Sequence, residues 1–202
     1  MSEDLELVKR AASGEESAFE QLVLQYQKPV YNLALRMSGN EDDAFDLAQE
    51  AFLNAWRGLK DFQFQSSFST WLYRLTSNVC LSYLRAKKRR STVSTVFLDA
   101  DEEETELVIP DSAPLPEERL IRKEDRSEVE QAINELEVEY REALSLSVFA
   151  GLSYEQIAQV QGVKEGTVKS RIFRAREKIR KKLLQSGNKN AARTSNEAKG
   201  GE

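Results

Sequence analysis

Hydrophobic residues recur every three or four positions along most of the chain, which is the spacing of amphipathic helices. Residues 19–26 and 41–59 follow this spacing closely. Residues 94–98 have the composition of a short strand, but no neighbouring segment has the alternating pattern of a pairing partner. The sequence therefore predicts an all-α protein.

A third helix is expected to begin near Thr70 and to run into a basic segment at Arg85–Arg90. Leu72 and Val79 share one face of this helix, as residues seven positions apart do. Residues 61–69, which precede it, lack helical spacing and are predicted to form a loop.

A proline-rich, acidic segment divides the chain. Three of the chain's four prolines lie in this segment, and Asp99–Asp111 holds seven acidic residues and no basic one. Such a segment cannot bury enough apolar surface to fold alone. We therefore expect an N-terminal domain over residues 1–91, a flexible acidic linker over 92–116, a C-terminal domain over 117–185 and a disordered tail over 186–202.

The C-terminal domain contains the pattern of a helix-turn-helix. Ser153 and Gln156 form a capping box that starts a helix at the next residue after Ser153. Counted from Tyr154, the fifth residue is Ala158, the ninth is Gly162 and the fifteenth is Val168. A small residue permits close helix packing, glycine adopts the positive φ of the turn, and the branched residue packs the second helix against the first.

The net charge of −5, from 29 basic and 34 acidic residues, conceals a segregated distribution. Lys164–Lys182 holds nine basic and two acidic residues, and Arg85–Arg90 holds five basic residues and no acidic one. Segregated charge creates local fields that the sum does not show. The pattern favours two DNA-facing surfaces joined by a solvated tether, although isolated charge runs are also typical of solvated helix faces.

The second helix of the helix-turn-helix is predicted to read duplex DNA. Arginine and serine donate hydrogen bonds to base edges in the major groove, and phenylalanine contacts the thymine methyl group. Lys178 on the flank is a candidate for holding phosphates. The alternative is a helical bundle whose basic face binds nothing. The candidate residues are Thr167, Lys169, Ser170, Arg171, Phe173, Arg174 and Arg176.

The loop before the third helix and the helix itself combine aromatic and basic residues, as single-stranded DNA binding requires. Bases stack on the rings while phosphates contact the cations, and polar groups read the edge of an unstacked base. The alternative, that the aromatic residues form the domain core, is favoured for Phe68 and Trp71. The candidate contacts are Phe64, Trp71, Arg74, Ser77, Asn78 and Arg85.

The composition argues against several other classes of protein. The chain has no histidine, which is the commonest general base and zinc ligand, so we expect neither an enzyme nor a metal or cofactor site. A single cysteine excludes an internal disulfide. No apolar run approaches a membrane span, and the acidic N-terminus is not a signal peptide, so we expect a cytoplasmic protein without membrane insertion.

Three stretches give the sequence a specific resemblance. Over residues 5–184 it resembles the extracytoplasmic-function sigma factors of the bacterial sigma-70 superfamily. The resemblance implies an alternative sigma factor that binds core RNA polymerase and directs promoter-specific transcription initiation. The stretches are Asp42–Phe52 with Trp56, Phe68–Leu75 with Asn78, and Gly166–Arg176.

The resemblance also implies roles for the candidate residues. The loop over residues 61–69 and the third helix are similar to the part that captures a flipped base of the minus-ten element, and the second helix of the helix-turn-helix to the reader of the minus-thirty-five element. The expected partners are the clamp helices of the largest polymerase subunit, the flap of the second-largest subunit, promoter DNA and an anti-sigma factor. The surface similar to the clamp-docking surface comprises Asp43, Asp46, Gln49, Glu50 and Asn54.

The sequence departs from the family pattern in the minus-ten reader. Family members often have a Gly-Asp pair where Phe64-Gln65 stands and an acidic residue where Ser82 stands. Two other interpretations remain. A stand-alone helix-turn-helix regulator leaves residues 41–90 unexplained, and a nucleic-acid enzyme would need clustered metal-binding carboxylates beyond those of one amphipathic helix.

Overall fold

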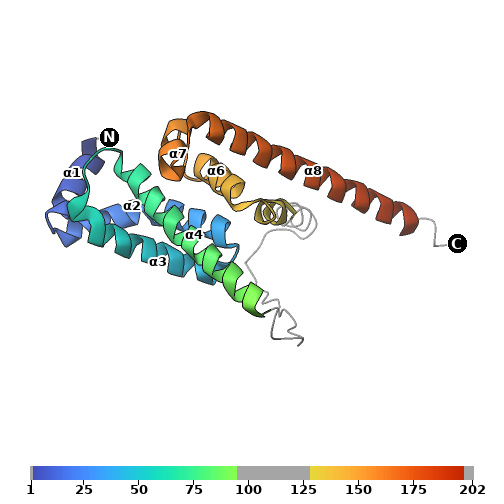
Figure 1. Ribbon diagram of the computed structural model, residues 1–202, viewed down its shortest axis with the longest axis horizontal. Coiled ribbons are helices and arrows are strands. Elements are labelled where there is room, and N and C mark those ends of the chain that lie inside the picture. The colour runs from blue at the N-terminus through green and yellow to red at the C-terminus, as the bar shows by residue number, and fades with distance from the viewer. Residues whose placement is uncertain (1, 95–127, 198–202) are drawn as a thin grey trace, which may run out of the picture.

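The computed structural model describes the backbone of residues 2–94 and 128–197, and the side chains within 4–90 and 128–185. These residues form helices and no strand, which confirms the all-α prediction (Figure 1). The helices are α1 (Ser2–Ala12), α2 (Glu16–Ser38), α3 (Glu41–Gly58), a 3-10 turn (Leu59–Asp61), α4 (Phe68–Ser94), α6 (Val138–Val148), α7 (Tyr154–Gln161) and α8 (Glu165–Glu197).

Some of the sequence predictions fall partly or wholly outside the described residues. Most of the acidic linker, the possible strand beyond residue 94, and residues 117–127 of the C-terminal domain lie there. Residues 128–134 are helical and precede α6.

The N-terminal half is a bundle of α1–α4 whose chain reversals follow from local sequence. Gly39 ends α2 with a φ of 73°, a left-handed conformation that glycine adopts without steric penalty. Asn40 caps α3, since its side chain accepts a hydrogen bond from the Asp43 N–H at 3.0 Å. Leu22, Leu33 and other apolar side chains then fill the space between the helices and are fully buried.

The C-terminal half contains the predicted helix-turn-helix. Ser153 Oγ accepts from the Gln156 N–H at 3.2 Å, and the Gln156 side chain accepts from the Ser153 N–H at 2.9 Å, so the capping box is present. Gly162 has a φ of 66° at the turn. Val168 and Ile172 are buried and fix α8 against α7.

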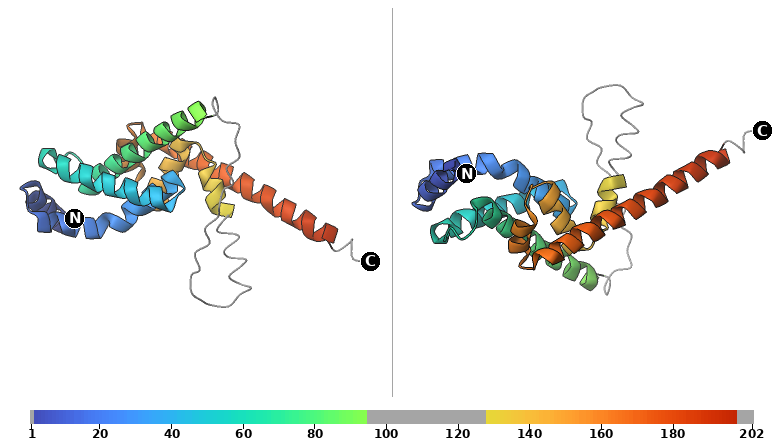
Figure 2. Two further views of the ribbon diagram at one scale, coloured as in Figure 1. Left: turned by 90° about the horizontal axis from the view of Figure 1, so that it is seen from below. Right: turned by 90° about the horizontal axis from the view of Figure 1, so that it is seen from above.

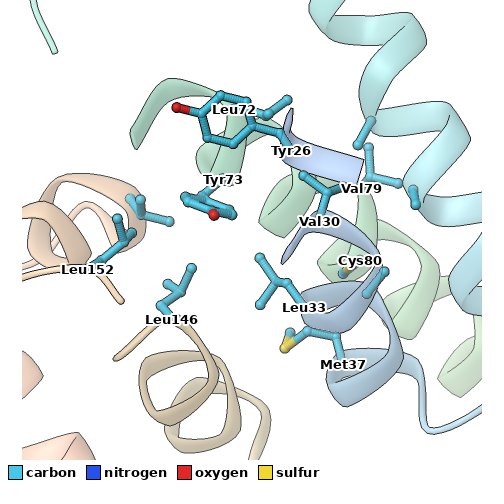
Figure 3. Packing of buried hydrophobic residues seen from close by; sticks show 14 of the residues in the cluster. Tyr26, Val30, Leu33, Met37, Leu72, Tyr73, Val79, Cys80, Leu146 and Leu152 are labelled. Atoms are coloured by element: carbon cyan, nitrogen blue, oxygen red, sulfur yellow. The ribbon is translucent and has the colours of Figure 1, made fainter. Parts of the chain in front are cut away.

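The two halves share one hydrophobic core. Figure 3 shows Leu146 and Leu152 of the C-terminal half pointing toward Leu33, Met37 and Tyr73 of the N-terminal bundle. All five side chains are buried. The separate domains expected from the sequence are therefore packed against each other here.

Arg36 on α2 reinforces this contact between the halves. Its guanidinium pairs with the Glu130 carboxylate at 3.2 Å and lies 4.9 Å from the centre of the Phe149 ring. Both partners belong to the C-terminal half, and the Arg36 side chain is only 19% exposed. Partial burial strengthens such an ion pair relative to one in open solvent.

Helix α8 is longer than the sequence predicted. It continues to Glu197, whereas we expected a disordered tail beyond residue 185 (Figure 2). Alanine, lysine and arginine in this segment favour a helix, whereas its glycine, asparagine, serine and threonine residues do not, so composition alone does not explain the extension. None of the described helices, α8 included, is long and apolar enough to cross a membrane.

The turn of the helix-turn-helix gives a stability prediction. Gly162→Ala is expected to lower the free energy of unfolding by about 1–2 kcal/mol, because a β-carbon disfavours the left-handed backbone. Gly166→Ala is the control, since Gly166 lies in α8 with no atom near an added β-carbon. It should raise stability by about 0.5–1 kcal/mol. Chemical denaturation followed by circular dichroism measures both, and equal effects would contradict the prediction.

Candidate nucleic-acid interface

The outward surface of α3 is acidic with apolar flanks. Asp46, Gln49 and Glu50 are exposed, and Asn54 is partly exposed. Phe45 and Leu53 are 57% and 53% exposed beside them. The sequence reasoning missed these two residues, although both lie outside the buried stripe of alanines and leucine that the helical spacing identifies.

Asp43 differs from the other residues predicted for this surface. Its carboxylate accepts a hydrogen bond from the Tyr83 hydroxyl of α4 and lies 3.7 Å from Lys87 Nζ. It is therefore engaged within the chain, whereas Asp46 faces solvent.

The aromatic loop presents one ring to solvent. Phe64 is 45% exposed, and its ring centre lies 4.8 Å from that of Phe62. Phe62 lies 5.0 Å from Trp71, and Phe68 is only 6% exposed. The core interpretation therefore fits Phe68, while Trp71 is half-buried and Phe64 stands at the outer end of an aromatic cluster with Phe62 and Trp71.

The backbone of Phe64 is unusual. Its φ is 56°, in the left-handed region that favours glycine. This conformation costs an L-residue about 1–2 kcal/mol. It occurs at the position where the resemblance noted in the sequence implies glycine in many relatives. An exposed aromatic residue thus occupies a position where glycine would be unstrained, and strained residues cluster at functional sites.

The predicted minus-ten contacts on α4 adjoin the C-terminal half. Arg74 donates a hydrogen bond to the Gln159 carbonyl of α7. Ser77 is fully buried. Asn78 and Arg85 line a cleft of about 520 Å³ between α4 and helices α6–α8. The structure thus brings these four residues together on one face but covers part of that face.

A polar network closes the inner side of this cleft. Gln161 donates to Glu142 Oε2 at 2.9 Å and accepts from Arg171 at 2.9 Å. Glu142 is 5% exposed, and burial raises the pKa of its carboxyl group. Arg171 therefore faces the contact between the halves, unlike the outward residues of α8 with which it was predicted.

The remaining predicted residues of α8 form an exposed surface. Phe173 is 67% exposed, Lys169 pairs with Glu165 at 2.8 Å, and Arg174 donates to the Tyr140 hydroxyl at 3.3 Å. These contacts orient the side chains without burying them. The exposed set is Thr167, Lys169, Ser170, Phe173, Arg174 and Arg176.

Lys178 has a partner within the domain. Its ammonium group pairs with Glu137 and lies 5.2 Å from the centre of the Tyr140 ring. Lys182 pairs similarly with Glu135 at 2.8 Å. These cations fasten α8 to the start of α6, so part of the basic run stabilises the domain.

Cys80 lies on the covered stripe of α4 that also carries Tyr73 and Ser77. It is fully buried, and burial raises the pKa of its thiol to about 12. Since the thiolate is the reactive form, burial makes this thiol unreactive in this structure.

Two family models match the chain. The model described as sigma-70 region 2 matches residues 22–90, and that described as sigma-70 region 4 matches residues 126–179. The RNA polymerase sigma-H factor of Pseudomonas aeruginosa is 43% identical over 182 residues, covering 90% of this chain and 94% of that protein. The ECF RNA polymerase sigma-E factor of Escherichia coli K12 is 40% identical over 187 residues, covering 91% and 97%.

Two solved structures of similar shape are complexes of a similar chain with another protein. CnrH in complex with the cytosolic domain of CnrY has a TM-score of 0.65 and 27% identity, covering 91% of this chain and 98% of that one. RpoE of Bartonella quintana in complex with the anti-sigma factor NepR also has a TM-score of 0.65, with 28% identity and coverage of 82% and 96%.

The contact between the halves gives a prediction for Cys80. Arg36→Ala removes the Glu130 ion pair and the Phe149 contact, which together should increase the open population about fivefold. The rate at which a disulfide reagent modifies Cys80 should increase by the same factor. Lys28→Ala, which removes an exposed cation from the same helix, is the control and should change nothing. Equal rates in all three proteins would show that opening of this contact does not expose Cys80.

Proposed function

Because the chain belongs to the extracytoplasmic-function sigma factors of the sigma-70 family, we propose that surfaces on α3, α4 and α8 divide polymerase docking and promoter reading between them. As a sigma factor, the protein binds core RNA polymerase and directs promoter-specific initiation. It supplies no reaction of its own; the polymerase performs the chemistry. The finer assignments below rest on the exposed residues of each surface.

The outward surface of α3 docks on the clamp helices of the largest polymerase subunit. Asp46, Gln49 and Glu50 supply carboxylates and an amide for hydrogen bonds and ion pairs, and Phe45 and Leu53 supply apolar area. Protein interfaces combine such an apolar centre with polar surroundings. The exposure of both phenylalanine and leucine on a helix otherwise well packed supports this role.

The aromatic loop and α4 bind the separated minus-ten strand. Phe64 offers an exposed ring for base stacking. Asn78 and Arg85 line the cleft between α4 and helices α6–α8. Arg74 and Ser77 continue this face, and Trp71 supports the stack through Phe62. Stacking accepts any base, while the polar side chains of α4 add discrimination.

The exposed surface of α8 reads the minus-thirty-five element in the major groove. Phe173 is the most exposed aromatic side chain of the described residues and suits contact with a thymine methyl group. Lys169, Arg174 and Arg176 donate to bases or phosphates. The C-terminal half also contacts the flap of the second-largest polymerase subunit.

Promoter reading requires the two halves to separate. In the packed form Arg74 is bonded to α7 and Ser77 is buried, so α4 cannot present both residues to DNA. Binding of polymerase to the open form shifts the equilibrium toward it, to the extent that polymerase prefers that form.

An anti-sigma factor holds the packed form in the cytoplasm. Two similar structures are complexes of this kind or resemble one, namely CnrH with the cytosolic domain of CnrY and RpoE with the anti-sigma factor NepR. A partner of this kind would stabilise the state in which the α4 face is covered.

Docking can be tested by mixing the purified chain with bacterial core RNA polymerase and mapping transcript starts. The wild-type chain should form a stable complex that starts at discrete promoters. Asp46→Arg should weaken the complex at least tenfold, since it reverses a charge in the docking surface. Glu20→Arg makes the same charge change at an exposed site on α2 and should bind normally. Normal assembly with Asp46→Arg would refute this docking surface.

The role of Phe64 can be separated from its structural contribution. Phe64→Asn relieves the left-handed strain but loses the contact with Phe62, so the free energy of unfolding should change by less than about 1 kcal/mol. Holoenzyme affinity for a single-stranded minus-ten oligonucleotide should fall by about 1–3 kcal/mol. Phe64→Trp keeps a stacking surface and should retain affinity. If asparagine binds as well as phenylalanine, the ring has no stacking role.

A further inference from the structure

Three side chains join the first turn of α3 to the C-terminal part of α4. The Tyr83 hydroxyl donates a hydrogen bond to Asp43 Oδ2, and Lys87 Nζ donates to the Tyr83 oxygen at 3.0 Å. Lys87 Nζ also lies 3.7 Å from Asp43 Oδ2 and 5.4 Å from the centre of the Tyr83 ring. Two donors from α4 thus converge on one carboxylate of α3.

The protonation states suit this arrangement. The hydrogen bond to Tyr83 raises the pKa of Lys87, so the amine stays charged. Burial, followed by the bond to Asp43, raises the pKa of Tyr83, so its hydroxyl keeps the proton that it donates. The link therefore persists unchanged through the neutral range.

Asp43 is itself held firmly by α3. Its N–H donates to the Asn40 cap at 3.0 Å, and its carboxylate lies in the first turn, where the helix dipole favours negative charge. The side chain is 32% exposed. The link therefore ties α4 to the capped first turn of the docking helix α3 rather than to a mobile side chain.

Lys87 differs in position from its basic neighbour Arg85. Residues two apart lie on nearly opposite sides of a helix. Arg85 lines the cleft beside Asn78, whereas Lys87 faces α3 and Asp43. The basic run of α4 is therefore not a uniform band of phosphate contacts.

We propose that Asp43, Tyr83 and Lys87 are positioning residues for promoter opening, which hold the DNA-facing part of α4 in a fixed orientation to the polymerase-docking helix α3. Lys87 then sets an orientation rather than binding phosphate, and Asp43 does so rather than contacting polymerase. The inference rests on the proposed function, because that function assigns α3 to polymerase and α4 to DNA.

The role of Lys87 is tested by the salt dependence of DNA binding. Holoenzyme made from core polymerase and the full chain is titrated with a promoter fragment whose minus-ten strands are already separated. Arg85→Gln should lower the slope of log affinity against log salt by about 0.7, because one phosphate contact is lost. Lys87→Gln should leave the slope unchanged. A slope change in Lys87→Gln equal to that in Arg85→Gln would overturn the proposal.

The role of Tyr83 and Asp43 is tested by kinetics. Tyr83→Phe removes one hydroxyl group and should slow open-complex formation on duplex promoter about fivefold, with core affinity unchanged within about twofold. Asp43→Asn should behave alike, and the double variant should be no slower than either, since both break one link. Additive slowing, or a core affinity lowered tenfold by Asp43→Asn alone, would overturn the proposal.

The wild-type holoenzyme distinguishes failure of the proposed function from failure of the positioning role. If it starts no transcription at a promoter, the proposed function fails. If it does start, but the Tyr83→Phe and Asp43→Asn rates match the wild type, only the positioning role fails. Lys87→Arg keeps a cationic donor and should form open complexes at the wild-type rate, whereas Lys87→Gln should form them more slowly. A purely steric role for the lysine stem predicts equal rates for these two variants.

Discussion

The contact of α4 with the C-terminal helices is the interaction on which the rest of the structure depends. One stripe of α4, through Tyr73, Ser77 and Cys80, is buried, and its Tyr73 faces Leu146 and Leu152 of the C-terminal half (Figure 3). The neighbouring Arg74 is bonded to α7, although it is also a proposed DNA contact. A helix face binds one surface at a time. Under the proposed function, the protein therefore has at least two states, and promoter reading depends on the free-energy difference between them.

The composition of this contact suits a reversible association. Leu33, Met37 and Leu146 supply buried apolar area, but Glu142 and Gln161 place a polar network beside it. The hydrogen bonds of this network lie within the C-terminal half, so they do not join the halves, while burial of the Glu142 carboxyl group is unfavourable. The network thus limits how stable the packed form is. Arg36 adds stability at the edge of the contact, where its side chain is only 19% exposed.

Much of the fold could be predicted because its signals are local. Helical spacing, the Ser153 capping box and the turn glycine Gly162 each depend on a few neighbouring residues, and all are present. The contact between the halves has no such signal, since the α4 stripe mixes serine, cysteine and tyrosine. The engagement of Asp43 by Tyr83 joins residues 40 positions apart, and periodicity within one helix does not specify such pairs. The exposure of Phe45 likewise depends on how α3 packs.

If Arg74 reads promoter DNA as proposed, it links promoter preference to the stability of the contact between the halves. The Arg74 guanidinium donates to the backbone carbonyl group of Gln159 in α7. This acceptor stays the same whatever side chain occupies position 159. A substitution of Arg74 that alters base preference also alters the fraction of molecules competent to join polymerase. Promoter preference and basal competence are thus pleiotropic, and a lineage that changes one must compensate the other elsewhere in the contact. Divergence of such regulators should therefore proceed through paired substitutions across the two halves.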